Sequence, residues 1–178
     1  LLARQSAAAM ATPLTSLAHA MPSYSKGGAP FLGLQLTISC RGLDNKDGFG
    51  GISDPFFKIS IIASKNVSSI YDSWGTRPGL KEIFRSRTKT RTLNPEWSPC
   101  LLPLHENVCG FEHQVDRLLL VQVFDYDSVT DHDLIGEFTT SVQDLLTRHT
   151  ERATASVEYP LVNTKKWAKE TSRGKHYV

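Results

Sequence analysis

The sequence predicts an all-β fold, a β-sandwich, on three observations. Several short segments are rich in apolar, β-branched or aromatic residues, clusters of turn-forming residues separate them, and helical periodicity is scarce. Many short strands with frequent turns are typical of two packed sheets. The clearest strand is expected at 32–40, where Leu34, Leu36 and Ile38 alternate with polar or small residues, the pattern of a half-buried strand.

Further strands are expected at 56–63, 118–124, 134–142 and 156–162, with turn-forming clusters at 47–51, 94–95 and 125–133. Helix is a minor component: one or two turns are expected at 143–146, with Ser141 as the N-cap. The segment 64–81 is expected to be an extended loop, to which we assign no function. Trp97 is interpreted as a packing residue of the core or of a strand rather than a lipid anchor.

Composition restricts the class of protein. The 178 residues carry a formal net charge of +2, which argues against a nucleic-acid partner held by bulk charge. No apolar run approaches the roughly 18 residues of a membrane-spanning helix, so any membrane contact is expected to be peripheral. The three cysteines, Cys40, Cys100 and Cys109, lack Cys-x-x-Cys spacing, and we interpret them as reduced thiols of an intracellular protein.

The chain is expected to have three parts. Residues 1–30 are rich in Ala, Ser, Thr and Pro and are expected to form a disordered tail or linker, with a transit peptide as the alternative. The Gly and Pro residues at 27–30 mark the start of the folded domain, expected at 31–163. Residues 164–178 are expected to form a basic linker to a further domain of a longer parent chain, with Lys165, Lys166 and Lys169.

The most informative segment is an acidic loop that directly follows a predicted strand. Four aspartates occur within nine residues: Asp125, Asp127, Asp131 and Asp133. Clustered carboxylates repel one another, and a hard divalent cation relieves that repulsion. Calcium is the natural candidate because it takes about six to eight oxygen ligands in irregular geometry. The alternative is a solvated acidic loop, which the position at the end of a buried strand disfavours.

The spacing excludes an EF-hand. Counted from Asp125, the sixth position is Thr130 where glycine is required, and the twelfth is Gly136 where a bidentate Glu belongs. The ligands must therefore converge from separate loops. A second acidic loop is present at 44–55, where glycines allow tight conformations and an Asp-Pro pair enters the next strand.

Three motifs in this order resemble a C2 domain, the calcium- and phospholipid-binding β-sandwich: Ser53-Asp54-Pro55-Phe56, Thr92-Leu93-Asn94-Pro95-Glu96-Trp97, and Asp125-Tyr126-Asp127 followed by His132-Asp133-Leu134-Ile135-Gly136-Glu137-Phe138. Within this family, 125–146 and 160–178 resemble the second C2 domain of copines, which carry two such domains followed by a von Willebrand A-type domain. The resemblance covers 31–178. It implies an eight-stranded antiparallel β-sandwich with little helix.

The resemblance also implies a site for two or three calcium ions. Five aspartates match the family's ligands: Asp47 and Asp54 in the loop at 44–55, which is the family's first loop, and Asp125, Asp127 and Asp133 in the loop at 125–133, which is its third loop. Thr130 and Asp131 are additional candidates. Asp47 lies seven residues before Asp54, where six is usual in the family, so Asp44 is an alternative ligand in the first loop.

A calcium-loaded C2 domain is expected to move from the cytoplasm to an anionic phospholipid membrane, such as the plasma membrane, when calcium rises. Lipid oxygens would complete the coordination of the ions, so that calcium and lipid strengthen each other's binding. Phe49, Ile52 and Val129 are candidates for membrane insertion, each contributing about 1.5 to 3 kcal/mol when buried. The alternative is that Phe49 or Ile52 packs beneath its own loop.

Basic residues alternate with hydroxyl residues over 85–92. In a strand, this pattern places Arg85, Arg87, Lys89 and Arg91 on one face. A basic patch on this strand in other C2 domains recognises phosphoinositides or acidic partners, and each basic residue near an anionic membrane contributes roughly 1 kcal/mol. The alternative is a solvated strand that protects a sheet edge.

The sequence contains no G-x-S-x-G, H-E-x-x-H or P-loop motif. We therefore interpret the chain as a non-enzymatic module that binds anionic phospholipid in a calcium-dependent way, for membrane targeting and signalling. One alternative is calcium-independent binding of phosphoinositide or a protein partner through 85–91. The other is a metal-dependent hydrolase.

Overall fold

The computed structural model describes residues 12–24, 30–48, 50–62, 79–103, 115–128, 131–151 and 157–164. In these ranges the chain forms eight strands and one helix: β1 (Thr12–Tyr24), β2 (Pro30–Cys40), β3 (Pro55–Ile62), β4 (Leu80–Arg85), β5 (Cys100–Pro103), β6 (Leu118–Asp125), β7 (Asp133–Ser141), α1 (Val142–Glu151) and β8 (Val157–Leu161).

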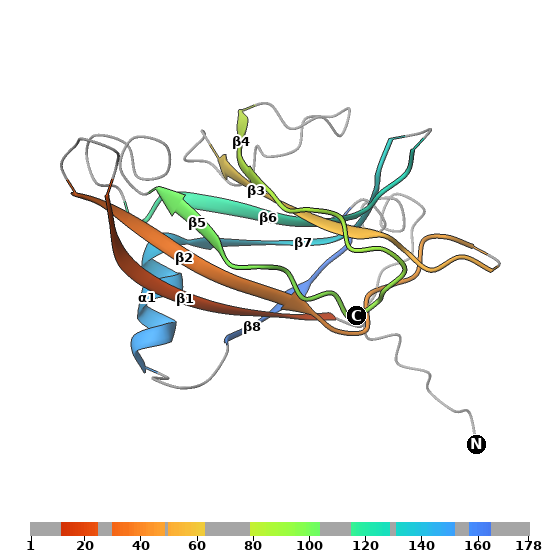
Figure 1. Ribbon diagram of the computed structural model, residues 1–178, viewed down its shortest axis with the longest axis horizontal. Coiled ribbons are helices and arrows are strands. Elements are labelled where there is room, and N and C mark those ends of the chain that lie inside the picture. The colour runs from red at the N-terminus through yellow and green to blue at the C-terminus, as the bar shows by residue number, and fades with distance from the viewer. Residues whose placement is uncertain are drawn as a thin grey trace, which may run out of the picture.

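The strands form two four-stranded sheets that lie one over the other (Figure 1). One sheet has the order β5-β2-β1-β8 and the other β4-β3-β6-β7, and every neighbouring pair is antiparallel. The predicted β-sandwich is therefore confirmed. Five predicted strands are also confirmed, with small differences at their ends, as β2, β3, β6, β7 and β8.

The core fills the space between the sheets. Alternate residues of β2 and β3 point inward, and Leu34, Ile59 and Val123 are completely buried. Trp97 packs in the same core with 6% of its surface exposed, as predicted, and its ring meets Phe57 edge-on at 5.0 Å between centroids. Side-chain alternation in extended strands explains why a period-two apolar pattern forms this layer.

The N-terminal tail expected at 1–30 is a wrong prediction for residues Thr12–Tyr24. These residues form β1, which pairs with β2 along nearly its whole length and with β8 at its beginning. The segment contains Pro13 and Pro22 together with Ala18 and Ala20, residue types that are depleted in strands. Pairing with strands distant in sequence overrides this weak local preference. The other expected boundaries, at 31, 163 and 164–178, stay predictions.

The basic strand expected over 85–92 is also wrong, because β4 ends at Arg85. The Ser86 hydroxyl oxygen accepts the Phe57 N–H at 2.9 Å, so a side chain takes the place of a backbone carbonyl in the ladder. Beyond it, Lys89 N donates to Pro55 O at 2.9 Å, while Arg91 has a left-handed backbone with φ of 51°. The segment therefore follows the edge of β3 as a loop.

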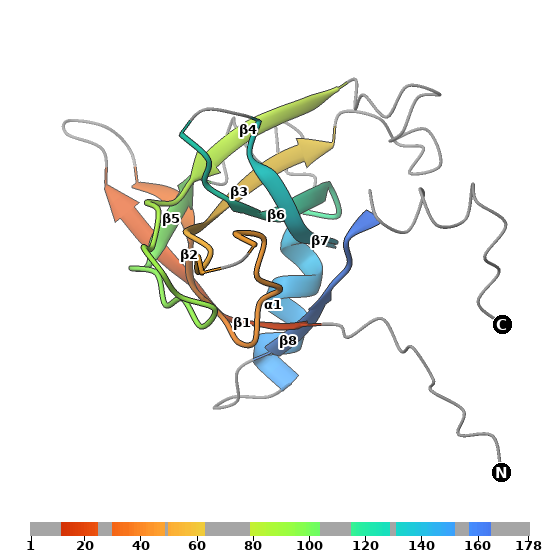
Figure 2. The same cartoon turned by 90° about the vertical axis from the view of Figure 1, so that its right-hand side faces the viewer.

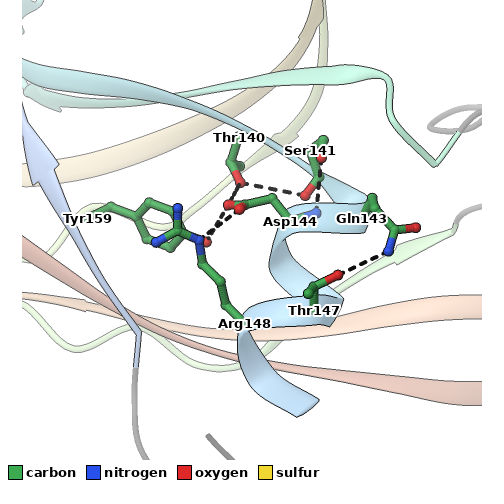
Figure 3. A network of polar contacts seen from close by, with 7 residues as sticks. All are labelled: Thr140, Ser141, Gln143, Asp144, Thr147, Arg148 and Tyr159. Carbon is green, nitrogen blue, oxygen red and sulfur yellow. Dashed lines mark hydrogen bonds and ion pairs between the residues drawn. The ribbon is translucent and has the colours of Figure 1, made fainter. Parts of the chain in front are cut away.

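Helix α1 connects the two sheets and is longer than the predicted single or double turn. The Ser141 hydroxyl accepts the Asp144 N–H at 3.0 Å, which confirms the predicted N-cap. The Asp144 carboxylate then accepts hydrogen bonds from Thr140 at the end of β7, Tyr159 of β8 and Arg148 one turn further along the helix (Figure 3). One carboxylate thus ties the helix to two strands.

The chain beyond β8 lies against β7. Val162 and Glu137 exchange two backbone hydrogen bonds of 3.0 Å, and Asn163 Nδ2 donates to Leu134 O at 2.6 Å. The Thr164 hydroxyl donates to the Glu137 carboxylate. Gly136 permits this close approach, because a Cβ there would lie 2.9 Å from the Leu161 Cβ. No helix in the described part of the chain is long and apolar enough to span a membrane.

The two described cysteines are buried and reduced. Burial raises the pKa of Cys40 to about 12 and that of Cys100 to about 11, so both are poor nucleophiles at neutral pH. Cys109, most of the segment 64–81 and the lysines at 165, 166 and 169 lie outside the described residues.

Candidate metal site at the loop end of the sandwich

The two acidic loops meet at one end of the sandwich. β3 begins at Pro55, directly after the first loop, and Pro55 pairs with Asp125 at the end of β6. Asp125 in turn pairs with Asp133 at the start of β7. Antiparallel register therefore brings residues 54, 125 and 133 to the same edge, and Figure 2 looks onto this end of the molecule. The sequence prediction of converging loops is consistent with this placement.

Backbone hydrogen bonds fix the loops to each other. Asp54 N donates to Oδ1 of Asp125 at 2.6 Å, and Tyr126 N donates to Asp54 O at 3.1 Å. Asp125 is 1% exposed, so its carboxylate lies inside the loop cluster rather than on its surface. A third contact comes from the loop after β4, where Arg91 N donates to Oδ1 of Asp54 at 2.6 Å.

The first loop is closed on itself by two polar side chains that the sequence analysis did not identify. Asn45 Nδ2 donates to Gly51 O at 2.9 Å, while Asn45 Oδ1 accepts the N–H of Ser53 at 3.0 Å. The Ser53 hydroxyl oxygen accepts the Lys46 N–H at 2.8 Å, and Ser53 is completely buried. These local bonds between side chains and backbone, an arrangement common in turns, hold Asp47 and Asp54 within one closed loop.

Asp47 lies directly against Gly51. A Cβ built on Gly51 would be 2.5 Å from the Asp47 Cβ and 3.0 Å from its carbonyl oxygen. Only glycine leaves this space, so Gly51 permits the close approach of Asp47.

Asp47, Asp54, Asp125 and Asp127 form one electrostatic cluster. Desolvation and then the negative charges of Asp125, Asp54 and Asp127 raise the pKa of Asp47, and the positive charge of Arg91 opposes this shift. The cluster therefore repels an additional negative charge and favours a cation. Asp44, the alternative first-loop residue, is exposed and pairs with Lys46 at 3.4 Å.

The carboxylates lie close together but do not have the geometry of a complete metal-coordination site. Among the described residues, no group of three or more His, Cys, Asp or Glu side chains is placed to hold a metal ion. Asp125 and Asp54 each use one oxygen to accept a backbone N–H. The second oxygen of the buried Asp125, Oδ2, has no hydrogen-bond partner within the described part of the chain. A buried carboxylate oxygen without a donor, beside other carboxylates, fits a hard cation with oxygen ligands.

The third loop contains aromatic contacts that the sequence analysis also missed. His132 Nδ1 accepts the Asp127 N–H at 3.2 Å, so the proton of the neutral ring is on Nε2. The His132 ring packs against Phe56 at 4.9 Å and Tyr126 at 5.0 Å between centroids. These contacts position Asp127. A histidine placed between two aspartates was the available sequence signal.

The loop end presents exposed apolar and acidic side chains. Ile52 is 38% exposed, so it does not pack beneath its own loop, and Tyr126 is 46% exposed. Asp131 and Asp133 are exposed on the third loop. Phe49, Val129 and Thr130, the other predicted insertion or ligand residues, lie outside the described residues.

The basic residues do not form the predicted single face. Arg85 lies over the Phe56 ring at 5.1 Å, beside Lys58, and both cations contact Glu82 at 3.5 and 3.3 Å. The loop after β4 is tied to the core, because the Arg87 carbonyl oxygen accepts the Trp97 Nε1–H at 3.0 Å. Arg87, Lys89 and Arg91 therefore stand on a loop leading from Arg85 toward the acidic end.

Comparison with known proteins identifies the family. A profile of the C2 domain family matches residues 35–158, which is more than half of the chain. The chain belongs to the C2 domain family. Its sequence is related to copines of Dictyostelium discoideum: it is 34% identical to Copine-B over 134 residues, 75% of this chain, and 37% identical to Copine-A over 113 residues, 64% of this chain. It spans 21% and 16% of the lengths of those proteins.

Solved structures agree with the C2 fold. A C2 domain of RIM from Drosophila superposes with a TM-score of 0.52 at 19% sequence identity, covering 86% of this chain and 99% of that domain. The domain named BON1-C2B superposes with a TM-score of 0.50 at 20% identity, covering 89% of this chain and 91% of that chain. These similarities extend over most of the sandwich.

Proposed function

We propose that this C2 domain binds anionic phospholipid membranes in response to calcium. The observation that carries the proposal is the acidic cluster around Asp125, a buried carboxylate whose Oδ2 has no donor among the described residues. The neighbouring charges that raise the pKa of Asp47 support the same reading. Two or three calcium ions are the proposed occupants.

The proposed ligands are Asp47, Asp54, Asp125, Asp127 and Asp133, with Thr130 and Asp131 as further candidates. Calcium bound there would neutralise the carboxylates and offer coordination positions to lipid phosphate or carboxylate oxygens. The chain's own contribution is to hold the two loops together through the Asp54–Asp125 contact and to leave room for Asp47 beside Gly51.

The exposed side chains of Ile52 and Tyr126 support contact with the membrane. Both side chains stand on the acidic loops, where burying an apolar or aromatic side chain at the headgroup boundary would favour membrane binding. Phe49 and Val129 are proposed as further insertion residues. We propose that the module is non-enzymatic, acts in the cytoplasm and moves to the plasma membrane for signalling when calcium rises. Further domains are proposed to follow it, because the copine relatives are much longer.

The test is co-sedimentation with vesicles of phosphatidylcholine and phosphatidylserine, with and without calcium, alongside a set containing phosphoinositide. The variant Asp127→Asn removes one proposed ligand charge. Asp116→Asn is the matched control, because Asp116 is an exposed aspartate before β6, at the opposite end of that strand from Asp125.

Calcium-dependent pelleting that Asp127→Asn loses and Asp116→Asn keeps is the expected result. Pelleting with phosphoinositide that ignores both calcium and Asp127→Asn would contradict it and would favour the basic residues Lys58, Arg85 and Arg87. An absence of pelleting under every condition would also contradict it and would favour a protein partner.

A further inference from the structure

Arg91 is held beside the acidic loops by the backbone. Its N–H donates to Oδ1 of Asp54 at 2.6 Å, across a sequence separation of 37 residues. The next residue, Thr92, donates its N–H to Ser53 O at 3.1 Å. These two hydrogen bonds attach the loop after β4 to the end of the first acidic loop.

The backbone at Arg91 has φ of 51°, and in the described part of the chain it is the one residue other than glycine with positive φ. This left-handed conformation suits glycine or asparagine better than a residue with a long side chain. Strained backbone conformations are often found at functional sites, so the arginine at this position suggests that its side chain has a function.

The charge of Arg91 acts on the cluster. The Arg91 N–H donates to the Asp54 carboxylate at 2.6 Å, so the guanidinium lies within one side-chain length of an acidic group of the cluster. The side chain is exposed, and no ion pair within 4.0 Å is found for it among the described residues. Within the described part of the chain, its charge is therefore not neutralised by one close partner.

We propose that Arg91 is a built-in counter-charge that lowers the calcium affinity of the acidic loops. The proposal rests on the proposed function. A positive charge beside ionised carboxylates stabilises them when no other cation is present. The same charge repels calcium once it binds, so the guanidinium favours the calcium-free protein over the loaded one. By linkage, this difference reduces the affinity for calcium.

The experiment is calorimetric titration of the protein with calcium alone, without lipid, at low and at high salt. Arg91→Gln removes the charge and keeps the same backbone strain. Arg87→Gln is the matched control, because Arg87 is an exposed arginine of the same loop whose backbone is bound to Trp97 and not to an acidic loop. Arg91→Lys keeps the charge. Arg91→Asn removes it in a residue suited to the left-handed backbone, should Arg91→Gln fold poorly.

Arg91→Gln and Arg91→Asn are expected to bind calcium on the order of fivefold more tightly than the parent at low salt. The difference should narrow at high salt, because mobile ions screen exposed charges. Arg87→Gln and Arg91→Lys are expected to match the parent. If the parent binds calcium and both neutral Arg91 variants bind it equally or more weakly, the counter-charge role of Arg91 is overturned. The proposed function is not affected by that result.

A second readout needs no calcium. In chelator at low salt, Arg91→Gln should melt at a lower temperature than Arg87→Gln, because only the first substitution removes a favourable charge from the carboxylates. Equal melting temperatures would overturn the inference. A parent that binds no calcium would overturn the proposed function and, with it, the role of Arg91 in calcium affinity.

Discussion

The backbone N–H of Asp54 donates a 2.6 Å hydrogen bond to Oδ1 of Asp125, joining two loops 71 residues apart in the sequence. Asp125 is at the end of β6 and almost completely buried, so the first acidic loop is attached to the rigid sheet. The carboxylate thus has two uses: one oxygen holds the loops together, and its negative charge contributes to the acidic cluster.

Asp125→Asn separates these two uses. The amide oxygen can still accept the Asp54 N–H, while the negative charge is lost. We expect the variant to fold and to bind calcium at least about tenfold more weakly, because calcium affinity depends on the number of charged ligands. Calorimetric calcium titration measures this, with Asp116→Asn as the control. Unchanged affinity would show that Asp125 does not ligate the ion.

Gly51→Ala tests the position of Asp47. The new Cβ would lie 2.5 Å from the Asp47 Cβ, so Asp47 or the loop must move. We expect stability to fall by about 1 to 3 kcal/mol, the usual cost of overpacking, and calcium binding to weaken. Denaturant unfolding and calcium titration check both. Gly42→Asn is the control, because a Cβ at Gly42 meets nothing within 4 Å and its φ of 62° lies in the left-handed region that asparagine tolerates. If Gly51→Ala has the stability and the calcium affinity of the parent, the close contact between Asp47 and Gly51 is contradicted.

The pH dependence of calcium binding follows from Asp47. Desolvation and neighbouring carboxylates raise its pKa, so the folded protein protonates this group at a higher pH than the unfolded chain does. Ionised Asp47 therefore costs stability above its folded pKa, and this cost disappears as pH falls through that pKa. Because calcium needs the ionised form, affinity should weaken as the pH falls from 7 toward the raised pKa of Asp47, more steeply in the parent than in Asp47→Asn. Calorimetric titration at several pH values measures both slopes, and equal slopes would exclude Asp47 as the group responsible.

Sequence patterns predicted the sandwich because apolar alternation in β2, β3 and β6 directly reflects burial on one side of a strand. They also predicted that the loops after β2 and β6 would meet. They missed β1, since its alanines and prolines have weak strand preference and only long-range pairing makes it a strand. Residues 86–92 were predicted as a strand because alternation of charge resembles a strand pattern even where a serine hydroxyl interrupts the ladder.

The supporting residues of the site were beyond sequence reasoning for a different reason. Asn45 and Ser53 act through hydrogen bonds to backbone groups seven or eight residues away, which leave no periodic pattern. His132 acts through its ring contacts with Tyr126 and Phe56. The five aspartates could be proposed because the resemblance to C2 domains implied them and because carboxylates are ligands that calcium prefers. The groups that orient them depend on the folded geometry.

Asp144→Asn tests the attachment of α1. Burial acts to raise the pKa of Asp144, but hydrogen bonds from Arg148, Thr140 and Tyr159 outweigh it and hold the pKa below its usual range. A lowered carboxyl pKa contributes stability that is present above the pKa of the unfolded chain and is lost as pH falls through the folded pKa. Because about a third of the side chain is exposed, solvent screening limits this contribution.

We therefore expect Asp144→Asn to lower the free energy of unfolding by about 1 to 2 kcal/mol at pH 7, and by less at about pH 3, below the ordinary carboxyl pKa, where the unfolded chain is already mostly protonated. Urea unfolding at the two pH values measures the difference. Tyr159→Phe removes one donor and keeps the ring that stacks on Phe138, so it should cost less than Asp144→Asn. Arg148→Gln removes the exposed ion pair and should cost less than about 1 kcal/mol. A loss for Asp144→Asn that is the same at both pH values would show that the carboxylate charge does not stabilise the network, and that packing alone holds the helix to β7 and β8.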